Sequence, residues 1–487
     1  MNNEHASMSS CSETRRRFLF STSMSISGLA LATLLKDDQL LAKELKPDLE
    51  RHTFDLLPRK PQFKPRARAM ISMFMQGGPS QMDLMDPKPM LNKYDGTIFP
   101  EKIKYDNAAQ SSSEILGVPW KFKKHGECGT DLSELLPHLA KVVDDITIIR
   151  SMHTGVNNHG ASIMALNSGM NRRGRPTVGS WLCYGLGSEA RDLPAFVALN
   201  DSAGLAERGP ENWSNGWLPS VYQGTPVRSQ EPRILNLDPP VHLSGTAQKR
   251  YLTFLDGLNQ KHLEEHPGEF DLEARIANYE LAAQMQLAAK DAMDIRGESE
   301  YTKKLYGIDK DVTREFSTRC LIARRLVERG VRCVQLFTPQ GRWDHHGKIR
   351  SRLPESCGMT DQGTAALIID LKERGLLDTT VVHWGGEMGR LPVIQNPTGP
   401  DKVGRDHNTY GFSMWVAGGG FKKGYVHGET DEWGHRAVKD VVNHYDYHAT
   451  LLHLFGLDYK NLVFHSNGRE RSLVDNQPAR VIHDLIA

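Results

Sequence analysis

Short apolar runs, separated by longer polar or amphipathic stretches, set the pattern of hydrophobic residues along the chain. Six of these runs have the length and composition of buried strands, and they cover residues 69–75, 146–149, 195–199, 331–337, 379–384 and 412–417. Between them the pattern predicts helices at residues 133–143, 160–167, 178–188, 365–374 and 447–455. Strands that alternate with helices favour an α/β fold with a mainly parallel central sheet flanked by helices.

Residues 201–330 depart from this alternation. Gly, Pro, Asn and Trp are frequent up to about residue 243, which indicates ordered loops over the sheet. From residue 246 the pattern is mostly helical, and Leu272, Ile276 and Tyr279 begin one amphipathic stripe. We therefore expect one domain over residues 66–487, with a loop-rich and helical insertion at about 201–330.

The N-terminal segment has the features of a targeting sequence. Arg15-Arg16-Arg17-Phe18-Leu19 begins a weakly apolar run that ends at Leu35. This combination is typical of a twin-arginine export signal, so we assign residues 1–32 to the signal and 33–65 to an extended lead-in. A short membrane anchor is the alternative, although the run is hydroxyl-rich for a bilayer span. We expect a periplasmic or extracellular protein with no membrane span in the mature chain.

Composition and charge exclude several classes of protein. The formal net charge is +1, so no overall field attracts nucleic acid or an anionic membrane. Without Cys11, which lies in the predicted signal, the cysteines are odd in number and none has CxxC spacing. This arrangement argues against a disulfide framework and against a structural zinc ribbon.

Acidic and histidine side chains gather after the later strands. The strand at 331–337 runs into Trp343-Asp344-His345-His346, the strand at 379–384 is followed by Glu387, and Asp406-His407 comes next. In open α/β sheets, ligands bind at the carboxyl ends of the strands. We predict one or two divalent metal ions there, Zn or Mn rather than Ca, because mixed carboxylate and imidazole ligands suit those ions. The predicted ligands are Asp344, His346, Glu387, Asp406 and His407. A hydrogen-bonded structural cluster is the alternative, and Glu387 could instead orient a ligand.

Further candidates follow the first two strands. Asp83 comes after the strand at 69–75 and is a sixth predicted metal ligand. His153 and His159 lie on the loop and helix start after the strand at 146–149, where helix N–H groups favour an anion. We take both histidines, with Arg390, as candidate catalytic residues. His159 could instead be a helix cap or core residue, and Arg390 could be a surface cation.

Taken together, these motifs resemble the DUF1501 family, within the alkaline phosphatase and sulfatase superfamily, from about residue 65 to the C-terminus. The resemblance rests mainly on Gly77-Gly78-Pro79-Ser80, Asn215-Gly216-Trp217, Trp343-Asp344-His345-His346, Gly386-Glu387-Met388-Gly389-Arg390 and Gly404-Arg405-Asp406-His407. It implies an α/β sandwich with one or two metals at the strand ends. Two positions depart from the superfamily's pattern: His159 stands where catalytic members have Ser, Thr or modified Cys, and Gln76 stands where they have a metal-binding Asp.

The sequence therefore predicts an exported, metal-dependent hydrolase of phosphate or sulfate esters, acting on a small molecule or a glycan. Two mechanisms remain open, attack by metal-activated water and attack by His159. A non-catalytic relative that binds an extracellular anionic glycan or a protein partner is the alternative function. The sequence does not indicate an oligomeric state.

Overall fold

The computed structural model describes residues 54–101, 103, 112–239, 242, 244–266, 269–395, 399 and 401–487. The predicted signal, residues 1–32, and the lead-in up to residue 53 lie outside this part. Within the predicted lead-in, residues 54–65 contain no helix or strand. Among the described residues, each helix is too short or too polar to cross a bilayer.

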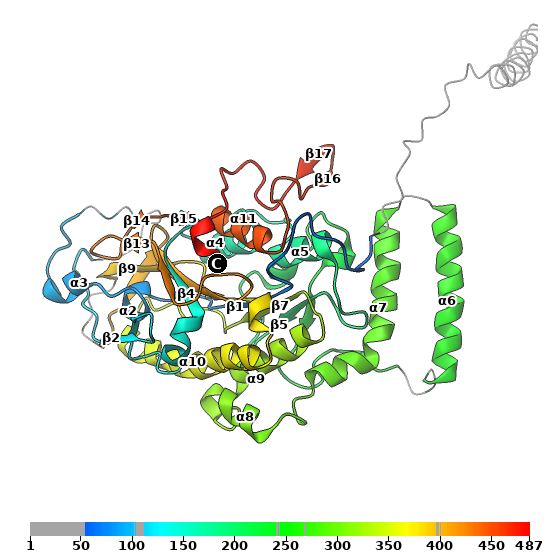
Figure 1. The fold of residues 1–487 in the computed structure, drawn as a ribbon, viewed down its shortest axis with the longest axis horizontal. Helices are drawn as coiled ribbons and strands as arrows, with labels where there is room; N and C mark the ends of the chain where they lie inside the picture. The colour runs from blue at the N-terminus through cyan, green and yellow to red at the C-terminus, as the bar shows by residue number, and fades with distance from the viewer. Residues whose placement is uncertain are drawn as a thin grey trace, which may run out of the picture. The chain divides into compact units, whose positions relative to one another are not determined.

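A nine-stranded sheet forms the centre of the fold. Figure 1 shows the sheet between layers of helices. Its strand order is β12-β4-β11-β8-β1-β7-β5-β6, and β15 also pairs with β4. The strands are β1 (Ala69–Phe74), β4 (Ile146–His153), β5 (Phe196–Leu199), β6 (Thr225–Val227), β7 (Cys333–Phe337), β8 (Thr380–Gly385), β11 (Phe412–Ala417), β12 (Tyr425–His427) and β15 (Val442–Asn443). Strand β11 is antiparallel to both β4 and β8, and the other pairings in this sheet are parallel. The predicted mainly parallel sheet is confirmed.

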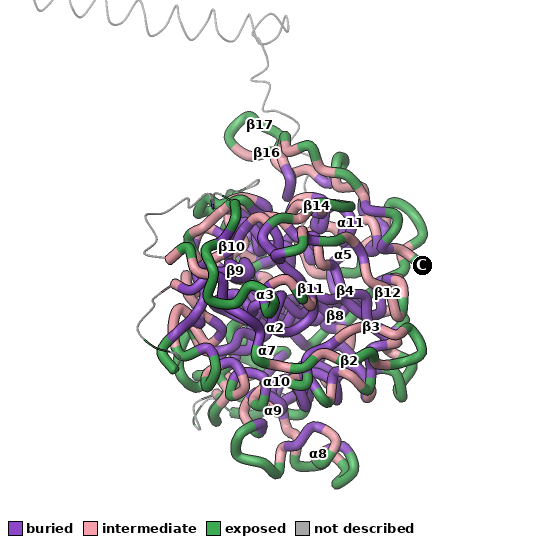
Figure 2. Tube along the Cα trace, turned by 90° about the vertical axis from the view of Figure 1, so that its left-hand side faces the viewer, coloured by how far each residue is buried: buried purple, intermediate pink, exposed green. Residues whose placement is uncertain are grey.

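Helices cover both faces of the sheet. Alternate residues of β1 point to opposite faces, so Ile71 and Met73 join one buried cluster while Met70 and Phe74 join the other. Helices α9 and α10 cover the first face, and α4, α5 and α11 cover the second (Figure 1). The central strands are buried along their whole length, as the purple trace in Figure 2 shows.

The other elements of the fold are helices of varied length and two-stranded ribbons. The helices are α2 (Gln81–Leu84), α3 (Pro89–Lys93), α4 (His159–Ser168), α5 (Val178–Leu186), α6 (Thr246–Glu265), α7 (Phe270–Met293), α8 (Glu300–Tyr306), α9 (Asp311–Glu328), α10 (Ile349–Glu373) and α11 (His444–Leu454). The ribbons pair β2 (Phe122–His125) with β3 (Thr130–Ser133), β9 (Gly389–Ile394) with β10 (Arg405–Asn408), β13 (Glu429–Thr430) with β14 (Ala437–Lys439), and β16 (Phe464–Ser466) with β17 (Arg469–Arg471).

Two predicted helices are corrected. Residues 133–143 do not form an α-helix: strand β3 ends at Ser133, and a 3₁₀ helix covers Leu139–Asp145. Pro137, which lacks the N–H group needed in a helix interior, lies between them. Conversely, the helix predicted at 365–374 is the end of α10, which begins at Ile349 and continues through Pro354. Gly363 lets α10 approach α9, because a Cβ there would lie 3.0 Å from the Cα of Ser317.

The segment predicted as an insertion has two parts in space. Strand β6 extends the sheet beside β5, and α9 packs on the sheet with α10, so both belong to the core. Helix α7 packs against α9 and contributes Met285, Ala289 and Met293 to the first buried cluster. Helix α6 instead lies outside the core beside α7 (Figure 1), and none of its residues is buried.

Candidate functional site

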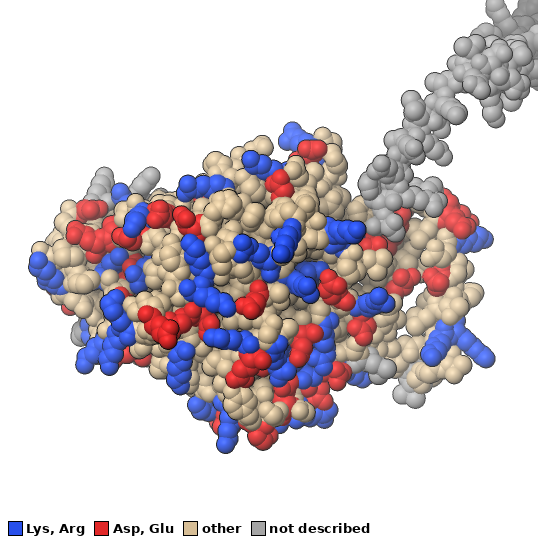
Figure 3. All heavy atoms as spheres, in the orientation of Figure 1, with Lys and Arg blue, Asp and Glu red and all other residues tan. Residues whose placement is uncertain are grey.

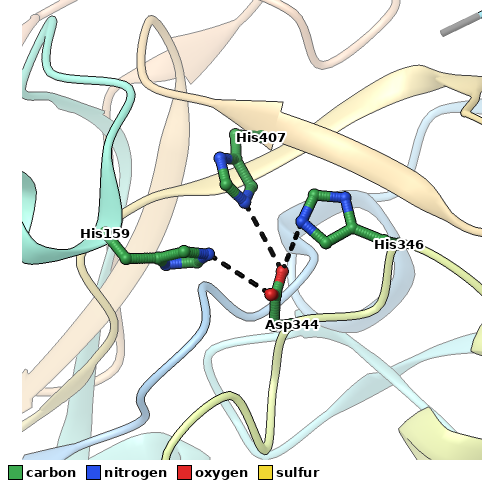
Figure 4. Close-up of side chains that lie close together, drawn as sticks. All are labelled: His159, Asp344, His346 and His407. Carbon is green, nitrogen blue, oxygen red and sulfur yellow. Dashed lines mark ion pairs between the residues drawn. The ribbon is translucent and has the colours of Figure 1, made fainter. Parts of the chain in front are cut away.

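Four side chains from three parts of the chain meet at the carboxyl ends of the parallel strands. Asp344 and His346 lie in the loop that follows β7, His159 begins α4 after β4, and His407 lies in β10. Their nearest nitrogen and oxygen atoms all lie within 4.8 Å of one another. Figure 4 shows the three imidazole rings pointing toward the Asp344 carboxylate.

The strands bring these loops together because their ends are in register. Phe74 of β1 pairs with Phe337 of β7 and with Gly385 of β8, so three strands end at the same level. A glycine then allows close packing of the loops. Gly77 has φ of 114°, and a Cβ there would lie 2.4 Å from the backbone nitrogen of Asp344. The backbone at Asp344 is therefore fixed against the end of β1.

Each imidazole presents its Nε2 atom to Asp344. The Nε2 atoms of His346 and His407 lie 2.9 Å and 3.4 Å from Oδ1, and the Nε2 atom of His159 lies 3.3 Å from Oδ2. Nε2 of His159 and Nε2 of His407 are buried and make no hydrogen bond within the described part of the chain. Buried nitrogen atoms without a hydrogen-bond partner fit the lone pairs of metal ligands.

The Nδ1 atom of each imidazole faces an oxygen that accepts its proton. His159 donates from Nδ1 to Glu387 Oε1 at 2.6 Å. His407 donates from Nδ1 to the backbone carbonyl of Asn157 at 3.3 Å. His346 donates from Nδ1 to Gln395 Oε1. Because a carboxylate and a carbonyl only accept, each ring carries a proton on Nδ1, and in its neutral form each ring leaves the Nε2 lone pair for a metal ion. Metal-binding histidines are oriented by such contacts in proteins generally.

Charges in the site favour an ionised carboxylate. Burial disfavours the charge of Asp344, but the Arg390 guanidinium and the three histidines hold its pKa well below the usual range. Burial also opposes the charge of His159, yet contacts with Asp344 and Glu387 raise its pKa to about 9. Burial lowers the pKa of His407. In the metal-free protein, the proton that a metal ion would displace is therefore held mainly by His159.

Arg390 and Glu387 are buried residues that contact Asp344 and His159. Arg390 is fully buried, and its guanidinium donates to the carbonyls of Gly78 at 2.9 Å and Arg405 at 3.1 Å and to Asp344 Oδ1 at 2.6 Å. It is therefore not the surface cation that the sequence left open. Glu387 is also fully buried, and its Oε1 accepts from His159 and from the Gly77 N–H at 2.9 Å. Both residues therefore contact members of the group of four directly.

Three other predicted residues lie outside the group of four. Asp83 forms a fully buried ion pair with Arg405 at 2.8 Å and does not belong to the group of four. Asp406 is adjacent: its Oδ1 accepts from the His407 N–H at 2.7 Å and lies 3.7 Å from His346 Nδ1. The His153 ring packs against Tyr410, with ring centroids 5.7 Å apart.

Several residues around the site carry no recognisable sequence signal. Asn157 and Gln395 orient imidazoles, yet neither belongs to a motif that we identified. Gln76, which replaces the expected Asp, accepts from the Glu207 N–H at 2.7 Å and donates to the Thr338 carbonyl. It therefore ties the loop that carries Glu207 to the ends of β1 and β7. This loop brings Arg208 against α4, which the sequence did not indicate.

Solved structures resemble this fold only distantly. A protein in the alkaline phosphatase superfamily from Vibrio parahaemolyticus has a TM-score of 0.35 and 13% identity, over 85% of this chain and 75% of that chain. A sulfatase from Pseudoalteromonas sp. has a TM-score of 0.33 and 14% identity, over 82% and 68% of the two chains. A phosphonate monoester hydrolase from Silicibacter pomeroyi has a TM-score of 0.31 and 12% identity, over 72% and 71%. Likenesses this distant assign no activity to this chain.

No curated protein matches the chain. A protein family matches nearly all of the described domain, over residues 67–486, and is described as "Protein of unknown function (DUF1501)". This confirms the resemblance that the motifs around Asp344 and Asp406 indicated. The chain belongs to the DUF1501 family.

Proposed function

We propose that this protein is an exported, metal-dependent hydrolase of phosphate or sulfate esters. The observation that carries the proposal is the convergence of three imidazole Nε2 atoms and the Asp344 carboxylate within 4.8 Å. Nitrogen and oxygen ligands in this mixture suit Zn or Mn better than Ca. When bound there, such an ion polarises ester oxygens and lowers the pKa of water.

The residues around the ligands support a catalytic site over a purely structural one. Glu387 holds the Nδ1 proton of His159, and Arg390 fixes the carboxylate of Asp344. Asp344 keeps 24% of its side chain exposed and His346 keeps 33%, so the group is open on one side. Structural metal sites are usually closed by protein ligands, whereas catalytic sites keep an open position.

We assign His159 as a metal ligand and not as the nucleophile. Its Nδ1 is held by a buried carboxylate, and its Nε2 points at the same centre as the two other imidazoles. A nucleophilic imidazole would need a free nitrogen directed at the substrate. Attack by water is therefore the mechanism that this geometry supports. The substrate is a small-molecule or glycan ester that reaches the open side.

The test combines metal analysis with a substrate panel. Full-length protein would be reconstituted with Zn, Mn or Ca and assayed with aryl phosphate, aryl phosphodiester and aryl sulfate. We expect turnover of at least one ester class with Zn or Mn. His159→Ala should lose both turnover and tight metal binding, because one ligand is removed. A nucleophile would give a different result, since His159→Ala would then lose turnover but keep its metal.

The Asp344→Ala/His346→Ala double variant is the control for contaminating hydrolases, because it lacks two of the four proposed ligands. Turnover that persists in this variant would not belong to the site. Wild-type protein that binds the metal and hydrolyses none of the esters would contradict the hydrolase proposal. The alternative, a protein that binds an anionic glycan or a protein partner, would then be favoured.

A further inference from the structure

Arg208 lies against Gly160 in the first turn of α4, and Gly160 follows the proposed ligand His159 in the chain. A Cβ on Gly160 would lie 2.0 Å from Nε and 2.3 Å from Nη2 of Arg208. Only a glycine at position 160 therefore leaves room for the guanidinium in this place. The neighbouring residue Glu207 interacts electrostatically with His159, Glu387 and Asp344, which places this loop at the site.

The loop holds Arg208 in an unfavourable backbone conformation. Its φ is 72°, which lies in the left-handed region that residues other than Gly and Asn rarely adopt. Hydrogen bonds on both sides maintain it: Gly209 N–H donates to the Ala206 carbonyl at 2.8 Å, and Asn212 Nδ2 donates to the Glu207 carbonyl at 2.6 Å. Asn167 of α4 donates in turn to Asn212 at 2.9 Å. Backbone strain maintained in this way is concentrated at functional sites.

The guanidinium of Arg208 has no acceptor among the residues that the structure describes. Within the described part of the chain it makes no hydrogen bond or ion pair, and its Nε is buried without a partner. Arg390, by contrast, has carbonyl and carboxylate acceptors for its Nε, Nη1 and Nη2. A guanidinium that is held in place beside a proposed metal site without an acceptor is suited to a ligand oxyanion.

We propose that Arg208 binds the non-bridging oxygens of the phosphoryl or sulfuryl group of the substrate. The proposal rests on the hydrolase function proposed above, and it assigns the anionic group to the space between Arg208 and the four proposed metal ligands. A planar guanidinium donates two parallel N–H groups to a tetrahedral oxyanion. Arg208 is thus a substrate-binding residue that selects anionic esters over neutral ones.

The experiment measures binding of inorganic phosphate and inorganic sulfate to the zinc-loaded full chain by calorimetry. Arg208→Asn removes the guanidinium and tolerates the left-handed backbone. We expect it to weaken binding of the preferred anion at least about tenfold with the zinc stoichiometry unchanged. Arg208→Lys keeps the positive charge but lacks the planar guanidinium with its paired N–H groups. Its anion affinity should therefore lie between those of Arg208→Asn and the wild type. Arg173→Ala, an exposed arginine, is the matched control and should bind like the wild type.

Two results would overturn the role of Arg208: anion affinity in Arg208→Asn equal to that of the wild type, or zinc-loaded wild type that binds neither anion. Ester assays separate this from the proposed function. Unchanged anion affinity and KM in Arg208→Asn, with wild-type turnover intact, would refute the Arg208 proposal alone. Arg208-dependent anion binding in a protein that hydrolyses no ester would support the anion site and refute the hydrolase.

Discussion

At the scale of single residues, the proton on His159 couples metal binding to pH. The carboxylates of Asp344 and Glu387 outweigh burial and raise its pKa to about 9, so the ring is protonated at neutral pH without metal. A metal ion requires the neutral ring, and its binding must therefore release this proton. The Nδ1 proton stays on Glu387's side of the ring in both states, because Glu387 accepts it.

We therefore predict that zinc affinity rises with pH up to about 9 and levels off above it. The slope should approach about tenfold per pH unit where one proton is released. Competition with a chelator of known affinity at several pH values measures this slope. His159→Gln should flatten it, and an affinity independent of pH in the wild type would contradict the assigned protonation.

Single residues also show which ligands sequence motifs can and cannot predict. Asp344 and His346 could be identified because they directly follow a strand whose apolar pattern is plain. Asp83 looked similar, but its carboxylate is neutralised by Arg405, 322 positions away in the chain. Because a buried carboxylate needs a partner, the choice between a metal and an arginine depended on a contact that the sequence does not contain.

At the scale of elements, the ribbon of β9 and β10 carries much of the site. His407 pairs with Arg390 across it, and an irregularity between Arg405 and His407 shifts the register. The ribbon packs on the loop after β7, where Arg405 N–H donates to the His345 carbonyl at 3.0 Å. The position of His407 relative to His346 is therefore set by the fit between these two backbone segments.

Gly404→Ala tests this fit. A Cβ there would lie 2.3 Å from the His345 oxygen and the His346 carbonyl carbon, and 2.4 Å from Gly347 N. Since the backbone must move to accept this Cβ, we predict a loss of about 1–3 kcal/mol in the free energy of unfolding. The same movement displaces the ligands His346 and His407 relative to each other, so zinc affinity should weaken about tenfold or more. Gly358→Ala is the control, because a Cβ on that exposed helical glycine meets nothing within 4 Å. Denaturant unfolding and zinc titration give both quantities, and wild-type zinc affinity in Gly404→Ala would contradict the proposed fit.

At the scale of the whole molecule, recognition of an anionic substrate must be local. The formal net charge is +1, and acidic and basic side chains are interspersed on the face that Figure 3 shows. The overall field is therefore weak, and binding of an oxyanion would depend on the metal site and Arg208. The proposed twin-arginine export agrees with a site completed by folding, because its ligands come from distant segments.

A metal ion that binds the folded state and not the unfolded state should raise the thermal stability of the protein. At a zinc concentration of about 1,000 times Kd, linkage adds about 4 kcal/mol to the free energy of unfolding, so we predict a Tm higher by several degrees. Calorimetric melting of the full chain with and without zinc measures the shift. The Asp344→Ala/His346→Ala double variant should melt at the same temperature in both conditions. An equal shift in this variant would place the bound zinc elsewhere.

The sequence by itself determined the alternation of strands and helices, the mainly parallel sheet, and the chemistry gathered after the strand that ends at Phe337. These follow from local periodicity and from the rule that parallel strands end at one edge. Only the tertiary structure decided which of the candidate residues meet. It paired Asp83 with Arg405, placed Glu387 against His159 and Arg390 against Asp344, and brought Arg208 against Gly160. The physical reason is that hydrogen bonds and ion pairs between buried groups are satisfied by partners distant in the chain, and no local pattern records those partners.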